Sequence, residues 1–412
     1  MQAFDSICIL STDYPSKDRP VYLFVEQLVC AMVEKGITVS VIAPQSLTKC
    51  LVRKIRVLPR HQSYATPGGM RYDVFRPYTV SFGMGHRRLY RLFRRYNQSA
   101  LERCLERIRP HVVYGHFWAN ACRLRNYAIT TQTPLFVACG EGNDALDRLG
   151  TSLSADERAF LRKTVCGVIS VSTENRMKCI GYGLTLPKDV IVLPNAVDPN
   201  LFFPRERNTK LRESLGVTNA DFLILFVGSF IRRKGCGILA QAVDRLNDPH
   251  IKVVFAGSVM PGEGTEPVCN GIVFKGIIAH EKLPDYYAAA DAFVLPTLHE
   301  GCSNAIVEAL AMGIPVISSF GRFNDDILND KNSIRVNPTS VDELVASIGK
   351  LKNDQVLYQK IRSNMILTAG NYSIEKRADK ILAFMNGQLI QNNKRQNTIE
   401  TNSSSAKKTL KH

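Results

Sequence analysis

The chain has 412 residues, 45% of them hydrophobic, and a formal net charge of +16. That length and apolar content suit two globular domains with substantial cores, and no apolar run approaches the roughly 20 residues that a membrane-spanning helix needs. The 11 cysteines contain no C-x-x-C pair, so we expect reduced cytosolic thiols and no zinc site, while the positive charge favours a polyanionic partner such as a membrane surface, a phosphorylated substrate or nucleic acid.

The first half of the chain alternates strand-like and helix-like segments. Its opening residues lack a basic region and turn polar after a short apolar run, which predicts a first buried strand rather than a signal peptide. Strands are expected at residues 7–10, 38–43, 55–58, 112–114, 135–139, 168–171 and 190–193, and helices at 20–35, 87–108, 119–130 and 155–164. Strands that alternate with helices predict a parallel, doubly wound α/β sheet.

The expected helix at 87–108 is amphipathic and strongly basic. Leu89, Leu92, Phe93 and Tyr96 share one side, and arginines surround them at positions 87, 88, 91, 94 and 95. This composition is typical of an interfacial helix on an anionic membrane. A packed helix with a basic outer face is the alternative. A nucleic-acid partner is not expected, because no recognised binding motif accompanies the charge.

Two titratable side chains follow strands of the first half. His116 comes after the strand at 112–114, and Glu141 lies in a glycine-containing loop after the strand at 135–139. Because ligands of parallel sheets bind at the carboxyl ends of the strands, either group can face an acceptor substrate. A lone histidine more often has a structural role, so both alternatives stay open for His116.

A second alternation starts near residue 221, after a polar linker at 194–210. Strands are expected at 223–227, 252–256, 272–274, 293–295, 316–318 and 334–336, and helices at 237–246, 282–289, 305–312 and 341–352. The chain is therefore expected to hold one Rossmann-like domain at 1–200, a second at 201–373, a helix at 374–390 and a disordered basic tail at 391–412. A cleft between two such domains is a natural ligand site.

A basic turn follows the first strand of the second half. Gly228 and Ser229 turn the chain, and three cations precede the next helix: Arg232, Arg233 and Lys234. Cations at a strand's carboxyl end can neutralise a diphosphate and stabilise a departing nucleoside diphosphate. Such a tripeptide by itself is typical of a solvated turn, and only the acidic loop further along the chain favours the functional interpretation.

That acidic loop lies between the strand at 293–295 and the helix at 305–312. Glu300 and Glu308 frame it, with seven residues between them. Small residues lead into the helix: Gly301, Cys302, Ser303, Asn304 and Ala305. The N–H groups at a helix start favour anions such as a diphosphate. We therefore predict a donor pocket in which Glu300 binds sugar hydroxyls, the helix start binds phosphate and Glu308 binds ribose hydroxyls. Two solvated surface charges are the alternative.

Three segments of the second half resemble one enzyme family. The loop and its flanks read HEGCSNAIVEALAMGIPV and resemble the E-x7-E motif of the family-four retaining glycosyltransferases, which have the two-domain GT-B fold. The basic turn resembles that family's G-R-L-x-x-x-K-G segment, with Ser229 where arginine is frequent. The linker reads PNAVDPNLFFP and resembles its interdomain segment, with Ala196 in place of glycine. The first domain departs from the family, because no histidine stands at 139–141.

The resemblance implies a retaining, metal-independent hexosyltransferase without a cofactor, whose catalytic candidates here are Glu300 and Lys234. His116 is a third catalytic candidate because of its place after a strand. The resemblance also implies that Ile277 lies near the nucleotide base and that the last helix packs across the first domain. The donor would be a UDP- or GDP-sugar. The acceptor would be a glycan or a polyprenyl-diphosphate-linked sugar of lipopolysaccharide or capsule assembly, at the cytoplasmic face of the plasma membrane. No Asp-x-Asp pair occurs in the sequence, which agrees with chemistry that needs no metal bridge.

Two other functions fit the same layout. A nucleotide-sugar epimerase would use the same two-domain plan and would isomerise its substrate without an acceptor. A protein that binds sugar nucleotides without catalysis would keep the donor pocket, and the missing first-domain histidine keeps this alternative open.

Overall fold

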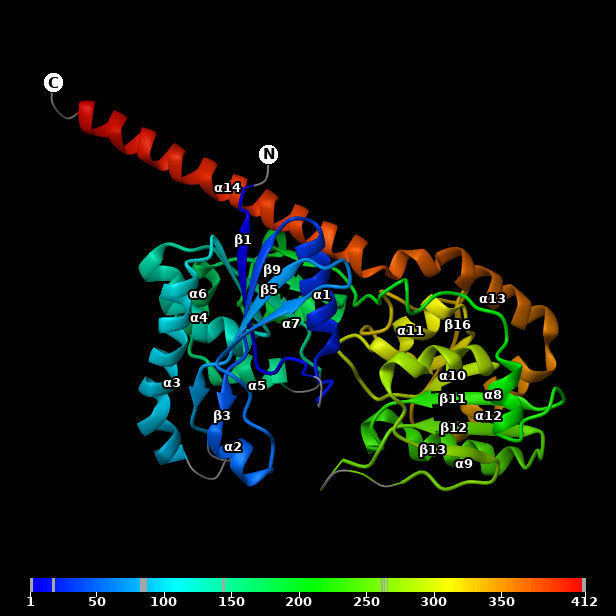
Figure 1. Ribbon diagram of the computed structural model, residues 1–412. Coiled ribbons are helices and arrows are strands. Elements are labelled where there is room, and N and C mark those ends of the chain that lie inside the picture. The colour runs from blue at the N-terminus through cyan, green and yellow to red at the C-terminus, as the bar shows by residue number, and fades with distance from the viewer. Residues whose placement is uncertain are drawn as a thin grey trace. The chain divides into compact units, whose positions relative to one another are not determined.

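The chain folds into two units, each built on one large sheet (Figure 1). The computed structural model describes residues 3–16, 19–81, 87–142, 145–260, 262, 264 and 266–409, except the side chains of 87–91 and 393–409. Unit 1 consists of Met1–Val171, Asn175–Leu193 and Ala378–His412, and unit 2 of Ser172–Glu174 and Pro194–Arg377.

The sheet of unit 1 has the strand order β10-β9-β8-β7-β1-β2-β5-β4 among the described residues. Its strands are β1 (Ser6–Ser11), β2 (Thr38–Ile42), β4 (His61–Ala65), β5 (Arg71–Phe75), β7 (Val112–His116), β8 (Leu135–Cys139), β9 (Val165–Ser170) and β10 (Val190–Val192). Neighbouring strands are parallel except at the edge, where β4 is antiparallel to β5. A short separate pair joins β3 (Gln45–Ser46) to β6 (Tyr78–Thr79).

The helices of unit 1 cover this sheet. They are α1 (Leu23–Glu34), α2 (Leu47–Val52), α3 (Arg87–Ile108), α4 (Trp118–Thr131), α5 (Ala145–Ser152), α6 (Ala155–Thr164), α7 (Thr173–Gly181), the 3-10 turn η1 (Pro187–Asp189) and most of α14 (Ile374–Thr409). Buried residues of α3 and α4, such as Leu105 and Leu124, form one apolar core with Val113 and Val137 of the sheet.

Helix α14 contacts unit 1 through both polar and aromatic side chains. Asp379 pairs with Lys35 at 2.7 Å, and Asn386 Oδ1 accepts a hydrogen bond from the N–H of Ala3. The ring of Phe384 lies 6.5 Å from that of Phe136 on β8. The part of α14 from Asp379 to Asn386 is therefore anchored on the first unit.

Unit 2 holds a fully parallel sheet with the order β13-β12-β11-β14-β15-β16 among its described residues. The strands are β11 (Phe222–Val227), β12 (Ile251–Ala256), β13 (Ile272–Gly276), β14 (Ala292–Leu295), β15 (Val316–Ser319) and β16 (Ser333–Val336). The helices are α8 (Thr209–Ser214), α9 (Cys236–Leu246), α10 (Leu283–Ala289), α11 (Asn304–Met312), α12 (Val341–Asn353) and α13 (Gln355–Thr368), with 3-10 turns η2 (Arg232–Lys234), η3 (His280–Lys282) and η4 (Ala369–Tyr372).

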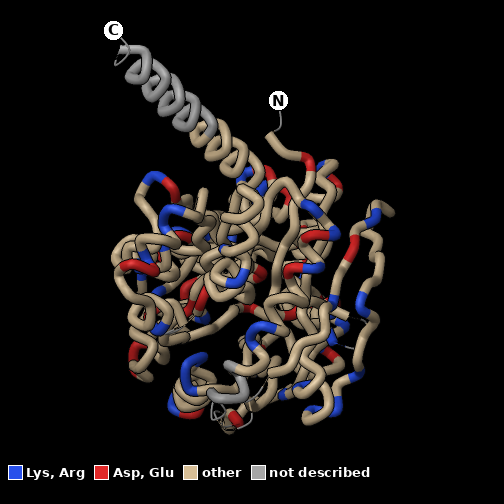
Figure 2. Tube along the Cα trace, turned by 90° about the vertical axis from the view of Figure 1, so that its left-hand side faces the viewer, with Lys and Arg blue, Asp and Glu red and all other residues tan. Residues whose placement is uncertain are grey.

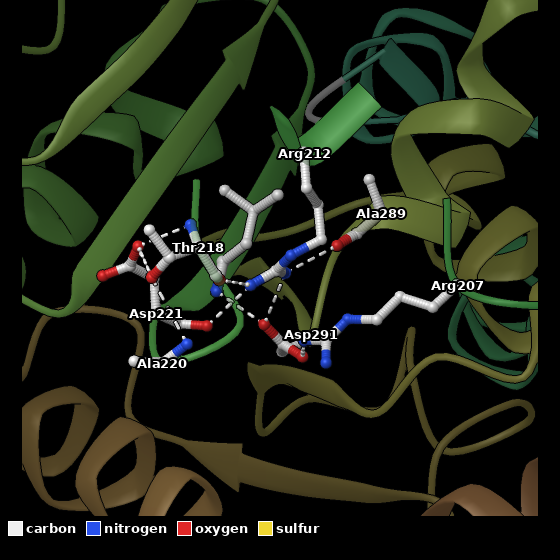
Figure 3. Close-up of polar contacts among 8 residues, drawn as sticks. Arg207, Arg212, Thr218, Ala220, Asp221, Ala289 and Asp291 are labelled. Carbon is white, nitrogen blue, oxygen red and sulfur yellow. Dashed lines mark hydrogen bonds and ion pairs between the residues drawn. The ribbon is translucent and has the colours of Figure 1, made fainter. Parts of the chain in front are cut away.

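A buried ion pair fixes the start of the two central strands of unit 2 (Figure 3). Arg212 of α8 is 1% exposed, and its Nη1 lies 3.0 Å from Asp291 Oδ2, just before β14. The same oxygen accepts from the N–H of Leu223 on β11, and Arg207 pairs with the other oxygen. Arg212 also donates to the carbonyls of Ala289, Thr218 and Asp221. One guanidinium thus joins α8, α10, β11 and β14.

The predicted α/β, doubly wound plan is confirmed in both units, but one strand prediction is wrong. Residues 55–58 form no strand. The edge of the unit 1 sheet is the antiparallel β4–β5 pair, which was not predicted. Polar residues fill β4, which is largely exposed, so it has no apolar signal. Helices α2, α5, α7, α8 and α13 were also missed. Helix α14 extends to Thr409, beyond the 390 boundary of the prediction, since neither proline nor glycine interrupts the sequence after Gly387.

Candidate active site

The basic turn and the acidic loop follow two adjacent strands of unit 2. Strand β11 pairs in parallel with β14, with Ile224 opposite Ala292 and Leu225 opposite Phe293. Parallel neighbours end at the same edge of a sheet, so the segments after β11 and β14 emerge side by side. The topology alone therefore brings residues 228–235 next to residues 296–304.

Gly235 allows these two segments to touch. Its φ of +75° lies in the left-handed region, and a Cβ atom there would meet the carbonyl oxygen of Pro296 at 2.2 Å. Only glycine fits such an approach without displacing the backbone. The carbonyl of Arg233 then accepts from Leu298 N–H at 2.8 Å and from Thr297 Oγ1 at 3.1 Å. The turn after β11 is thus fastened to the loop after β14.

The fastened loops place two cations on one carboxylate. Glu300 Oε1 lies 2.6 Å from Lys234 Nζ and 3.0 Å from Arg233 Nη1, and it accepts from Thr297 Oγ1 at 2.9 Å. The side chain of Glu300 is only 10% exposed and that of Lys234 16%. Burial raises the pKa of Glu300, but the charges of Lys234 and Arg233 and the hydrogen bonds outweigh it and lower the pKa overall. Glu300 is therefore held as a carboxylate.

The start of helix α11 follows directly. Ser303 occupies the N-cap position, but its side chain makes no capping hydrogen bond. The first N–H groups of the helix can therefore donate to another acceptor. Asn195 of the linker supports this turn, since its Nδ2 donates to Cys302 O at 3.1 Å and to Asn304 Oδ1 at 2.7 Å. Burial raises the pKa of the Cys302 thiol to about 12, so it stays protonated.

Glu308 lies one turn into α11 and is 6% exposed. Its Oε2 accepts from Tyr287 Oη at 2.9 Å, and its Oε1 lies 3.4 Å from His280 Nε2. Burial, followed by the charge and hydrogen bond of Glu308, raises the pKa of Tyr287 well above its usual value. The sequence alone could not identify Tyr287 and His280 as the partners of Glu308, because they belong to other elements, α10 and η3.

The other predicted donor-site residues of unit 2 are placed as follows. A Cβ atom added at Gly228 (φ +157°) would lie 3.6 Å from Lys234 Cδ. Ser229 is half-buried. Arg232 is exposed and Gly301 is buried, while Ala305 packs on the core. Ile277 follows β13 and is 77% exposed, although apolar side chains of this size usually avoid water. The structure brings Lys234, Arg233 and Glu300 into contact, and Glu308 makes its contacts elsewhere.

His116 and Glu141 belong to unit 1. They lie at the carboxyl ends of β7 and β8, where His116 pairs in register with Ala138. His116 is 6% exposed and packs against the rings of Phe24 and Phe117, at 5.5 and 4.7 Å. Glu141 Oε1 accepts from the N–H of Trp118, the first residue of α4, at 2.7 Å. His116 therefore has a packed environment, and Glu141 caps a helix.

Glu141 should make the stability of the chain depend on pH near neutrality. Burial raises its pKa to about 7, although the Trp118 N–H partly opposes the shift. A carboxyl whose pKa is raised on folding stabilises the fold fully below its unfolded pKa, and this contribution disappears as the pH rises through about 7. Glu141→Gln keeps an acceptor for the Trp118 N–H and should remove this decrease in stability. Urea unfolding of both proteins at pH 5 and pH 8 measures the free energy of unfolding, and an equal decrease in the variant would disprove the assignment.

Comparison with known proteins finds a family similar to part of the second unit. Residues 221–354, which carry both loops, match the family model of glycosyl transferases group 1. Among relatives, the putative teichuronic acid biosynthesis glycosyltransferase TuaC of Bacillus subtilis is 25% identical over 87% of this chain and 92% of its own length.

Other relatives match this chain over shorter stretches. The chain spans 54% of the length of an uncharacterised glycosyltransferase of Methanocaldococcus jannaschii (29% identity over 48% of this chain). It spans 60% of an Escherichia coli UDP-Gal:α-D-GlcNAc-diphosphoundecaprenol α-1,3-galactosyltransferase, with 25% identity over 54% of this chain.

Solved structures give the fold of the whole chain. Sucrose-phosphate synthase of Thermosynechococcus elongatus aligns with a TM-score of 0.71 and 17% identity, over 94% of this chain and 98% of its own. Anabaena HepE in complex with UDP-glucose aligns with a TM-score of 0.68 and 18% identity, over 93% and 99%. These neighbours confirm the GT-B fold, with two Rossmann-like domains.

The described residues form neither a membrane-spanning helix nor a cluster of metal ligands. Across the described part of the chain, none of the helices combines the length and the apolar composition that crossing a membrane requires. In the same residues, no group of three or more His, Cys, Asp or Glu side chains is placed to hold a metal ion.

Proposed function

We propose that the chain is a retaining glycosyltransferase that transfers a hexose from a UDP- or GDP-sugar, without a metal ion. The acceptor is a glycan or a polyprenyl-diphosphate-linked sugar of cell-surface polysaccharide synthesis, such as lipopolysaccharide or capsule. The observation that carries this proposal is the contact of Lys234 and Arg233 with Glu300 at the end of β14, inside the region that matches the glycosyltransferase family.

Each group of this site has a defined task in the proposed reaction. Lys234 and Arg233 neutralise the donor diphosphate and stabilise its charge as the bond to the sugar breaks. The uncapped start of α11 supplies N–H donors to the same phosphates. Glu300 orients both cations and accepts from sugar hydroxyls, and Glu308 accepts from the ribose. His116 of unit 1 is the remaining candidate for the acceptor side.

The names of the relatives support the acceptor class. The Escherichia coli relative is named for a diphosphoundecaprenol-linked acceptor, and TuaC for teichuronic acid. A lipid-linked acceptor needs an enzyme at the inner membrane surface. Helix α3 suits a peripheral contact there, because Leu92 and Tyr96 are 71% and 45% exposed beside the exposed Arg94 and Arg95.

A ligand screen followed by a transfer assay tests the proposal. UDP or GDP should stabilise the protein by about 2.7 kcal/mol at a hundredfold excess over Kd, measured by thermal shift over a panel of nucleotide sugars. Transfer to a GlcNAc-diphosphoprenol acceptor on anionic vesicles should retain the anomeric configuration by NMR and persist in EDTA. Isomerised donor without acceptor would indicate an epimerase, and nucleotide binding without any transfer would indicate a non-catalytic protein.

A further inference from the structure

Unit 1 contains a large cavity whose walls are strongly basic. The cavity has a volume of about 1410 Å³ and lies between the loop after β1, helix α2 and helices α3 and α4. Figure 2 views the molecule from the side on which α3 lies in Figure 1, with Lys and Arg in blue. Among the described residues, its lining includes nine Lys or Arg and three Asp or Glu, an excess of six positive charges.

Arg76 is the buried cation of this wall. It is 3% exposed, and one of its nitrogens, Nη2, donates to Tyr64 Oη at 2.6 Å. The other terminal nitrogen, Nη1, is buried and has no hydrogen-bond partner among the described residues. A buried guanidinium stays charged, and an unpaired buried charge is costly. The fold therefore keeps a positive donor in the cavity wall without an acceptor of its own.

The acidic residues of the wall do not neutralise Arg76. Asp13 pairs with Arg19 at 2.6 Å, and Glu102 accepts from Gln98 at 2.9 Å. Glu157 accepts from Ser154 N–H at the start of α6. Lys49, Arg94 and Arg95 have no ion pair among the described residues either. The cavity wall thus has the charge and the unpaired donor of an anion-binding site.

We propose that this cavity binds a diphosphate group of the acceptor, with Arg76 as its buried anchor and Lys49, Arg94 and Arg95 as its outer cations. Guanidinium forks match phosphate oxygens by paired, charge-assisted hydrogen bonds. The volume exceeds that of an ordinary small-molecule site, so a sugar can occupy it together with the diphosphate. The assignment of the diphosphate to an acceptor substrate rests on the proposed function, whereas the anion site itself is independent of it.

The test measures binding of inorganic pyrophosphate and of farnesyl diphosphate to the full chain by calorimetry, with whichever of UDP and GDP binds present at saturation to fill the donor site. Two variants report on the cavity: Arg76→Met and the exposed pair Arg94→Gln/Arg95→Gln. Each should weaken binding of both probes at least about tenfold, because each removes charge-assisted hydrogen bonds. The exposed pair supplies the result if Arg76→Met does not fold.

The double variant Arg103→Gln/Arg107→Gln is the matched control, because it removes the same charge from the same helix outside the cavity. Unchanged pyrophosphate binding in both cavity variants would overturn the site, as would equal weakening in the control. Binding of a glucuronate oligosaccharide in preference to both diphosphates would replace the diphosphate by a carboxylated glycan and overturn the assignment. The affinities for UDP and for GDP, each measured alone, report separately on the donor site, so the absence of both would count against the proposed function and not against the cavity.

Discussion

Lys234→Ala and Glu300→Ala should each reduce kcat/KM for sugar transfer by about a hundredfold to a thousandfold, the usual cost of removing one group that stabilises transition-state charge. Without Lys234, the diphosphate loses a cation that now lies 2.6 Å from Glu300. Without Glu300, Lys234 and Arg233 lose the carboxylate oxygen that both contact, and the Nη1 of Arg233 keeps the carbonyl of His299. Steady-state kinetics with the donor identified by the ligand screen measures both losses.

Lys352→Ala is the matched control for these variants. Lys352 also belongs to unit 2 and also pairs with one carboxylate, Asp248, at similar exposure, but it lies on α12, away from the two loops. Its removal should leave kcat/KM unchanged. Near-normal activity of both site variants, with circular dichroism showing that they fold, would show that the paired loops of unit 2 do not carry the chemistry.

Arg212→Met should reduce the free energy of unfolding of unit 2 by about 3 to 5 kcal/mol, the expected cost of breaking a buried ion pair by removing one partner. The change leaves Asp291 with Arg207 and the Leu223 N–H, and it removes one donor from each of three backbone carbonyls. Because Arg212 joins α8, α10, β11 and β14, the loss should spread across the sheet that carries the candidate site. Hydrogen exchange of β11 and β14 peptides measures it in unit 2 specifically.

Arg245→Met provides the comparison for the buried pair. Arg245 pairs with Asp342 at 2.7 Å, but both side chains are more than half exposed, and such surface pairs contribute at most about 1 kcal/mol. A similar loss of protection in both variants would mean that burial of Arg212 is not the source of the effect. The single tryptophan, Trp118, lies in unit 1, so its fluorescence should change little in either variant.

The sequence by itself determined the alternation of strands and helices, because buried parallel strands read as short apolar runs and amphipathic helices as a repeating pattern. It also determined which residue types stand after β11 and β14. Two predictions failed in the first unit: the exposed edge strand β4 lacks an apolar signal and was not predicted, and the apolar residues at 55–58 were predicted as a strand but form none.

Only the tertiary structure decided which of these residues meet. In the sequence, 65 residues lie between Lys234 and Glu300, and their contact depends on the pairing of β11 with β14 and on the space that Gly235 leaves for Pro296. The partners of Glu308 and the unpaired Nη1 of Arg76 were invisible for the same reason. Local patterns encode secondary structure, whereas a site is made by contacts between segments that strand order alone brings together.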